Sequence, residues 1–207
     1  MALGKLDKSK NPKVVIVTNS SLNYLDKENN LKQREPKTAA LNVITEAANV
    51  AKMDLGTLQV SFKQGDEWKN YWIDVNEKNN NISLTPCNNA DKNAIVYANA
   101  FAKENGGYSY SFNEKSEAGK AFVEGLSVKT WVNEKEGRTS DFVESRVTLK
   151  NDELKKQLTD KGDGAIAVLS KNGFEIKLES ELKTEKAQKT QEKQTPEISK
   201  KNDDLER

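Results

Sequence analysis

The stretch LQVSFKQGDEWKNYWIDV, residues 58–75, decides the fold, because two runs with a two-residue period flank a short polar segment. Apolar and polar residues alternate along 58–63 and again along 68–75, which is typical of strands with one buried face. The intervening segment 64–67 contains Gly65 and has the composition of a turn. We therefore predict a β-hairpin. Its expected apolar positions are Leu58, Val60, Phe62, Tyr71, Ile73 and Val75.

Helical patterns lie on both sides of this hairpin. Pro36 precedes a confident helical pattern from Thr38 to Met53, and Gly56 stands where a helix stop is expected. The apolar positions of this helix recur every three or four residues, at Leu41, Ile44, Ala48 and Ala51. Further helices are expected, the first of them short and followed by a loop, in Leu22–Pro36, Asp91–Glu104, Ser116–Glu124 and Asp152–Thr159.

Further segments predict more strands, the first of them a short apolar run typical of a buried strand. They are Val14–Thr18, Tyr108–Phe112, Leu126–Val132, Phe142–Leu149, Ala165–Ser170 and Phe174–Leu178. The last two are joined by Lys171-Asn172-Gly173, and Asn-Gly between alternating segments is a strong hairpin signal. The sequence therefore predicts an α+β fold of mostly antiparallel hairpins, with two or three packed helices.

Composition divides the chain of 207 residues into three parts. Residues 1–13 form a basic arm that we expect to be flexible, and 14–182 form one α+β domain, with 113–126 as the expected break if it contains two subdomains. From Lys183 onward, Lys, Glu, Gln and Thr dominate and aromatic residues are absent. Such a segment buries too little apolar surface to offset its ordering entropy, so we expect residues 183–207 to be a disordered tail.

Residue usage excludes several function classes. The chain contains no histidine and only one cysteine, Cys87, so it cannot build a Ser–His–Asp triad, a Cys–His dyad or a Cys/His metal site by itself. We expect no metal and no cofactor. No apolar run is long enough to span a membrane, and the basic N-terminus lacks the apolar centre of a signal peptide. We therefore expect a soluble, cytoplasmic protein without a membrane partner.

Charge argues against a global attraction to nucleic acid. Seven basic and six acidic residues lie from Lys183 onward, which leaves the preceding part of the chain neutral. Only four of the 33 basic residues are arginine: Arg34, Arg138, Arg146 and Arg207. Bidentate recognition of phosphate therefore has few candidates, and any nucleic-acid binding must depend on a local patch.

The local patch with the strongest signal is aromatic. Trp68 and Trp72 share one face of their predicted strand, with Lys69 adjacent and Lys63 across the hairpin. A second alternating pair is Tyr108 and Tyr110. Aromatic side chains on a sheet, next to lysines, stack the bases of single strands in several protein classes. The competing interpretation is that both pairs face the core, since aromatic residues at period two usually do.

Three function classes remain open. The first is a non-catalytic accessory protein, such as those of plasmids and phages, that binds single-stranded nucleic acid through Lys63, Trp68, Lys69, Trp72, Tyr108 and Tyr110. The second is a protein-interaction or adaptor module that uses an exposed sheet edge, or the tail as a ligand. The third is a carboxylate-dependent enzyme, because Glu179-Ser180-Glu181 resembles the Glu-x-Glu motif of ADP-ribosyltransferases. The Ser-Thr-Ser strand of that family is not evident here. We favour the first class, with no catalytic residue assigned.

Overall fold

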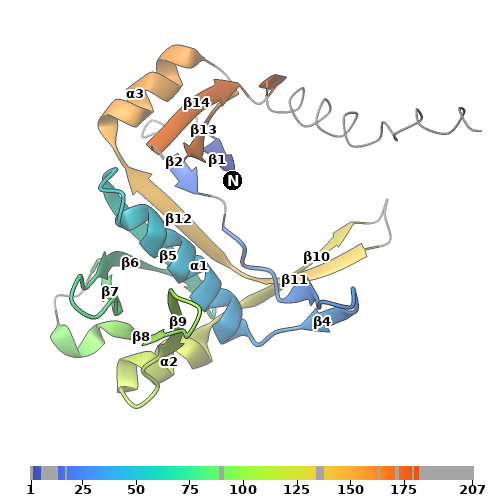
Figure 1. Ribbon diagram of the computed structural model, residues 1–207, viewed down its shortest axis with the longest axis vertical. Helices are drawn as coiled ribbons and strands as arrows, with labels where there is room; N and C mark the ends of the chain where they lie inside the picture. The colour runs from blue at the N-terminus through green and yellow to red at the C-terminus, as the bar shows by residue number, and fades with distance from the viewer. Residues whose placement is uncertain are drawn as a thin grey trace, which may run out of the picture.

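A seven-stranded antiparallel sheet dominates the computed structural model (Figure 1). The structure describes residues 2–5, 14–16, 18–88, 91–133, 138–162, 164–170, 173–178 and 180–181. In spatial order the sheet consists of β2 (Val14–Ile16), β12 (Ser145–Lys150), β5 (Thr57–Gln64), β6 (Glu67–Val75), β7 (Ile82–Pro86), β8 (Val96–Ala102) and β9 (Tyr108–Phe112). Each neighbouring pair is antiparallel. The predicted α+β fold with a mostly antiparallel sheet is thereby confirmed.

One face of this sheet, the inner face, packs on helix α1 (Pro36–Ala51), which crosses it in Figure 1. Pro36 at the first helical position suits a helix start, because its ring fixes the backbone angle and its missing N–H has no partner there. The side of α1 that meets the sheet includes several small residues, which allow close approach. Its buried residues are Ala39, Ala40, Val43, Ile44, Ala47, Ala48 and Val50.

The strand register aligns the apolar residues of the inner face in rows. Val147, Val60 and Tyr71 lie side by side on β12, β5 and β6, and all three are buried. Helix α2 (Glu117–Gly125) adds Phe122, whose ring lies 5.1 Å from that of Phe62 in an edge-to-face contact. Burial of such large apolar side chains is the main stabilising contribution to the sheet.

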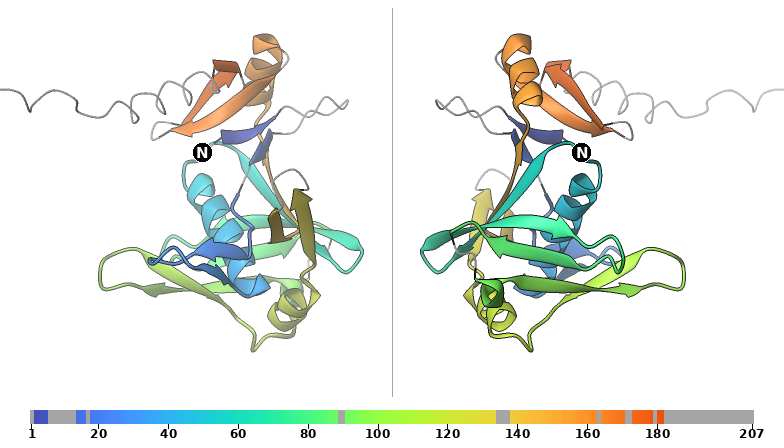
Figure 2. Two further views of the ribbon diagram at one scale, coloured as in Figure 1. Left: turned by 90° about the vertical axis from the view of Figure 1, so that its right-hand side faces the viewer. Right: turned by 90° about the vertical axis from the view of Figure 1, so that its left-hand side faces the viewer.

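A three-stranded sheet lies beyond the end of the main sheet (Figure 2). It contains β1 (Ala2–Lys5), β13 (Ala165–Ser170) and β14 (Gly173–Leu178), and α3 (Asp152–Lys161) contacts β13 and β14. The side chain of Asn151 caps α3 by accepting a hydrogen bond from the Leu154 N–H at 2.8 Å. Ala2–Lys5 were expected in a flexible arm, but they pair with β13 instead.

Two further hairpins project from the main sheet. They are β3 (Asn23–Leu25) with β4 (Leu31–Gln33), and β10 (Val128–Asn133) with β11 (Arg138–Val143). Asp141 joins them, because its carboxylate accepts hydrogen bonds from Gln33 at 3.0 Å and Thr130 at 2.6 Å. We call β3, β4, β10 and β11 together the hairpin arm.

The predicted helix Asp91–Glu104 is wrong. Only a short 3₁₀ turn, Lys92–Ala94, forms, and Val96–Ala102 are strand β8. The alanines at 98, 100 and 102 are strong helix formers, but pairing with β7 and β9 overrides that local preference. The alternation of buried Val96 and Ala98 with exposed Tyr97 reveals the strand.

The short helix expected in Leu22–Pro36 is also wrong, because this segment forms β3 and β4. The carboxylate of Asp26 accepts hydrogen bonds from the backbone N–H groups of Glu28 and Asn30, both at 2.9 Å. Asn29 adopts a φ of 63°, a conformation that asparagine tolerates better than most residues. These local bonds favour a tight turn over a helical one.

The other elements follow the sequence predictions. The hairpin 58–75 is β5 and β6, the helix after Pro36 is α1, and the last two helical predictions are α2 and α3. The strands expected near residues 14, 108, 126, 165 and 174 are also present, whereas the single strand expected at Phe142–Leu149 is divided at Glu144 between β11 and β12. The predicted tail, 183–207, lies outside the described residues, as do residues 6–13. A division near 113–126 stays untested, although Phe122 of that range belongs to the continuous core.

Candidate functional site

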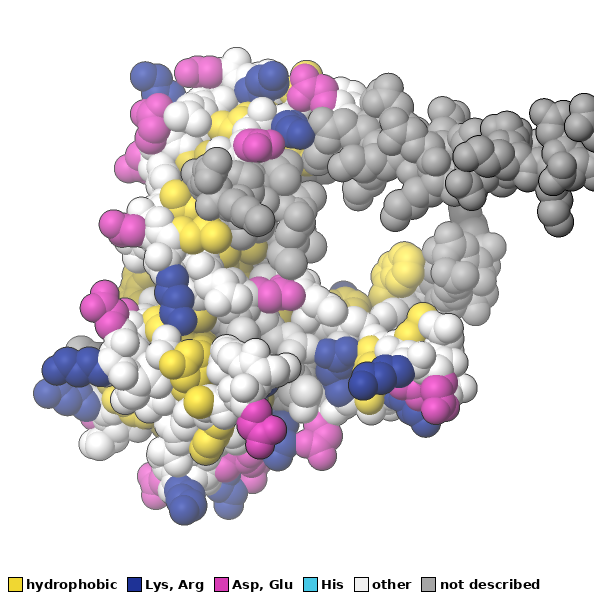
Figure 3. Space-filling model, viewed as in Figure 1, with side chains coloured by type: hydrophobic (Ala, Val, Ile, Leu, Met, Phe, Trp, Pro, Cys, Tyr) yellow, Lys and Arg dark blue, Asp and Glu magenta, His cyan; other side chains and the backbone are white. Residues whose placement is uncertain are grey.

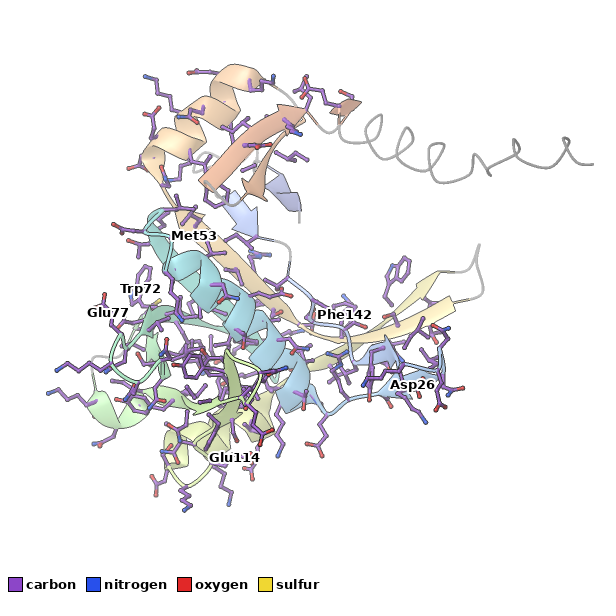
Figure 4. The ribbon with its side chains drawn as sticks, in the orientation of Figure 1. Asp26, Met53, Trp72, Glu77, Glu114 and Phe142 are labelled. Atoms are coloured by element: carbon purple, nitrogen blue, oxygen red, sulfur yellow. The ribbon has the colours of Figure 1, made fainter. Side chains whose placement is uncertain are left out.

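The outer face, which is the face of the seven-stranded sheet opposite α1, carries Trp68 and Trp72. Both alternate along β6 with Tyr71 and Ile73, which are buried on the inner face. Trp68 is 44% exposed and Trp72 is partly exposed. Figure 4 labels Trp72, which projects away from α1. Among the described residues, helices α1 and α2 pack on the inner side, and the outer face has exposed side chains such as Trp68 beside the buried Ser61 and Thr148.

Each of these tryptophans has a cation over its ring. The guanidinium carbon of Arg146 lies 5.5 Å from the Trp68 ring centroid, and Lys150 Nζ lies 4.4 Å from that of Trp72. Both cations come from β12, which is two strands away from β6 in the sheet. Such contacts stabilise an exposed site by roughly 0.5–1 kcal/mol each. They also place two positive charges next to the indole rings.

Lys63 completes the positive side of the outer face. It lies directly opposite Trp68 in the β5–β6 register. Its ammonium nitrogen is 3.4 Å from a carboxylate oxygen of Glu144, the residue between β11 and β12. Lys63 is therefore partly neutralised, whereas neither Arg146 nor Lys150 forms an ion pair with another described residue. The latter two are the cations most available to a ligand.

Hydrogen-bonding side chains fill the space between these cations and the tryptophans. The hydroxyl of Ser61 donates to Asn70 Oδ1 at 2.6 Å, which fixes the amide orientation and leaves its NH₂ group for another acceptor. Gln59 Nε2 donates to the Cys87 sulfur at 3.1 Å. Cys87 is thus partly buried as a hydrogen-bond acceptor at the edge of this surface.

Three of the six predicted site residues lie on the other side of the sheet. Lys69 is in register with Phe62 on the inner face, and its ammonium pairs with Glu67 at 3.0 Å. Tyr110 packs against the core, and burial raises the pKa of its hydroxyl, with a smaller contribution from Tyr108. Tyr108 shares that face and is 40% exposed at the strand end. The structure therefore brings together Lys63, Trp68 and Trp72 only.

A shallow hollow of about 370 Å³ lies beside Trp68, where β7 ends and α2 begins to cover the inner face. Tyr71 and Phe122 line its apolar side, and Gln64, Asn70 and Asn88 contribute amide groups. Gln64 donates to the Tyr71 hydroxyl at 3.2 Å, while burial raises the pKa of that hydroxyl. The hollow is therefore lined by neutral groups and by Lys69.

The sequence predictions missed four residues of the outer face: Arg146, Lys150, Tyr97 and Phe101. Arg146 and Lys150 alternate with buried Val147 and Leu149, so their common orientation was readable from residues 145–150. Their proximity to the tryptophans of β6 could not be predicted in this way, because it depends on the order of the strands in the sheet. Tyr97 and Phe101 were hidden by the wrong helix prediction for 91–104.

The other sequence candidates are placed separately. Glu181 accepts a hydrogen bond from the Leu178 N–H at 2.7 Å and lies 3.6 Å from Lys161, and these contacts lower its pKa. Glu179 lies outside the described residues. In the described ranges there is no group of three or more Asp, Glu, Cys or His side chains placed to hold a metal ion. Helices in the same ranges are too short or too polar to cross a membrane.

No protein-family model, no curated protein and no solved structure matches the chain. The outer face must therefore be interpreted from its own chemistry. It combines exposed indole rings, cations beside them and amide or hydroxyl groups between them. Such a surface can bind a flat, partly apolar group that carries a negative charge nearby.

Proposed function

We propose that this protein binds single-stranded nucleic acid without catalysis, through the outer face of its main sheet. The observation that carries the proposal is the pairing of two tryptophans with two cations: Trp68 with Arg146, and Trp72 with Lys150. Bases supply flat rings for the indoles, and the adjoining phosphates supply negative charge for the cations. A single strand offers both groups at once, whereas a duplex hides its ring faces in the base stack.

The placement of the tryptophans supports a binding role over a role in folding. The core of the sheet is complete on the inner face, where Tyr71 and Ile73 of the same strand are buried. Single exposed aromatic side chains are common on protein surfaces. Several that lie together outside the core are more typical of a binding surface. The modest number of cations agrees with the neutral charge of the chain up to residue 182.

Tryptophan fluorescence tests the proposal directly. The chain has three tryptophans, and Trp131 lies on the hairpin arm, away from the outer face. We expect oligothymidylate or oligouridylate to quench the Trp131→Phe variant as strongly as the wild type. Trp68→Ala or Trp72→Ala should weaken binding by about 1–3 kcal/mol per lost stack. If both alanine variants bind the oligonucleotide as strongly as the wild type does, the proposal is refuted.

The hairpin arm favours a second candidate function, protein interaction. Several of its apolar side chains are largely exposed, and Figure 3 shows hydrophobic groups on this projection. They are Leu25 at 62%, Leu31 at 69%, Trp131 at 54% and Val132 at 56% exposure. If a protein partner binds there, Leu31→Ser and Trp131→Ser should abolish the complex and Trp68→Ala should leave it intact. The reverse pattern would assign the partner to the outer face.

A further inference from the structure

We propose that the bound strand continues past the tryptophan pair, along a diagonal series of four aromatic side chains on the outer face. The aromatic track consists of Trp68, Trp72, Tyr97 and Phe101. The inference rests on the proposed function and extends it, because it specifies an extended single strand that crosses β6, β7 and β8 as the ligand. It also assigns Tyr97 and Phe101 as stacking residues.

The strand register places the two added residues on the same face as the tryptophans. Asp74, two residues after Trp72, lies opposite Ser83, and Ser83 lies opposite Tyr97. These three residues therefore form one row across the outer face. Phe101 follows four residues later on β8, opposite Ser109 of β9.

Exposure agrees with this placement. Tyr97 is 40% exposed, while its neighbours Val96 and Ala98 are each 2% exposed on the inner face. Phe101 is 54% exposed near the end of β8, where Ala100 is half-buried and Ala102 is exposed, so its face is given by the strand register. Neither aromatic ring takes part in the continuous core.

The four rings are almost evenly spaced. Trp68 and Trp72 are four residues apart on one strand, as are Tyr97 and Phe101, which corresponds to about 13 Å in each pair. Trp72 and Tyr97 are separated by two strand spacings and one two-residue step, or about 12 Å. Successive bases in a helical stack are only about 3.4 Å apart, so one stacked segment cannot serve two rings. The ligand must be unstacked and extended between them.

The surface between the rings suits such a strand. The outward side chains of β7 and of β8 between Tyr97 and Phe101 are small or neutral: Ser83, Thr85 and Asn99. Asp74 is the one carboxylate among the described outward residues of β6, β7 and β8. Among the described outward residues of β12, β5, β6, β7 and β8, the cations lie on β12 and β5, so the Trp68 end holds phosphate while the Phe101 end holds bases.

A length series tests this inference. Oligothymidylates and matched oligouridylates from about 4 to about 16 nucleotides span the usual site sizes of sheet-based single-strand binders. We expect affinity to rise with length until all four rings are covered. Tyr97→Ala and Phe101→Ala should each weaken binding of the longest oligomers by roughly 5- to 150-fold and leave the shortest unchanged. The two sugar types distinguish DNA from RNA as the ligand.

Tyr108→Ala is the matched control, because Tyr108 is as exposed as Tyr97 but lies on the inner face. It should bind every oligomer like the wild type. Long oligomers that bind Tyr97→Ala and Phe101→Ala with unchanged affinity, while Trp68→Ala still weakens binding, would overturn the track and leave the proposed function standing. If no oligomer binds the wild-type chain, both the proposed function and the track are refuted.

Discussion

The salt dependence of binding can be calculated from the cations of the outer face. Arg146, Lys150 and Lys63 are the positive side chains beside the tryptophan pair. Each phosphate neutralised on a single strand contributes about −0.7 to the slope of log affinity against log salt concentration. Three contacts predict a slope of about −2, so a fourfold rise in salt should weaken binding roughly 20-fold.

Charge removal should lower this slope in steps. Arg146→Gln or Lys150→Gln should each reduce it by about 0.7, so that the same rise in salt costs only about 7-fold. Lys63→Gln should reduce the slope equally but lower the affinity least, because a phosphate must first displace Glu144, 3.4 Å away. Lys69→Gln is the control, since Lys69 lies on the inner face and pairs with Glu67. Anisotropy of a labelled oligonucleotide at several salt concentrations measures every slope.

Two results would refute this reasoning. An unchanged slope in the Arg146→Gln, Lys150→Gln double variant would mean that phosphates do not contact β12. A slope twice as steep as calculated would require more cations than the outer face provides, and residues 183–207, with seven basic side chains, would then be the region to remove next. A lowered slope in Lys69→Gln would transfer the site to the inner face.

Two further predictions concern stability. Phe122→Ala should lower the free energy of unfolding, measured by urea titration, by about 3–5 kcal/mol. The reason is that Phe122 is buried against Phe62, Tyr71 and Phe112. Val132→Ala is the control, because Val132 is exposed and its loss should change the free energy of unfolding by less than about 0.5 kcal/mol. The pKa of Glu181 is lowered, first by the hydrogen bond from the Leu178 N–H and then by Lys161. The carboxylate therefore stabilises the folded state at pH values above the usual glutamate pKa, and this stabilisation is lost as the pH falls through the pKa of Glu181 in the folded protein. Glu181→Gln should therefore lower the Tm at pH 7 but not in strong acid, and an equal loss at both pH values would contradict this account.

The sequence pattern predicted correctly those helices and strands whose apolar periodicity matches the side chains that they bury in the folded protein. The hairpin at 58–75 shows this best, because the same alternation that marks its strands also divides Tyr71 from Trp72. Strand β8 shows the opposite case. Its alanines favour a helix by intrinsic propensity, and only the hydrogen bonds to β7 and β9 decide for a strand.

The candidate site was predicted in part for a related reason. Alternation along a strand shows on which face of the sheet a residue lies. It could have placed Lys69 and Trp68 on opposite faces, and Tyr108 on the same face as buried Phe112. This alternation does not show which strands are neighbours in the sheet. Arg146 reaches Trp68 only because β12 inserts next to β5, more than 80 residues after it in the chain. No spacing rule in the sequence predicts that contact.

The outer face and the hairpin arm lie on different elements, so the two proposed functions can be tested separately by mutation. The tryptophans of the outer face are on β6, whereas Trp131 is on β10 of the projecting arm. The two regions are nevertheless joined, because β11 continues through Glu144 into β12, and Glu144 pairs with Lys63. Glu144→Gln would remove this ion pair without altering the tryptophans or the hairpin arm, so an unchanged oligonucleotide affinity in that variant would mean that Lys63 does not contact phosphate.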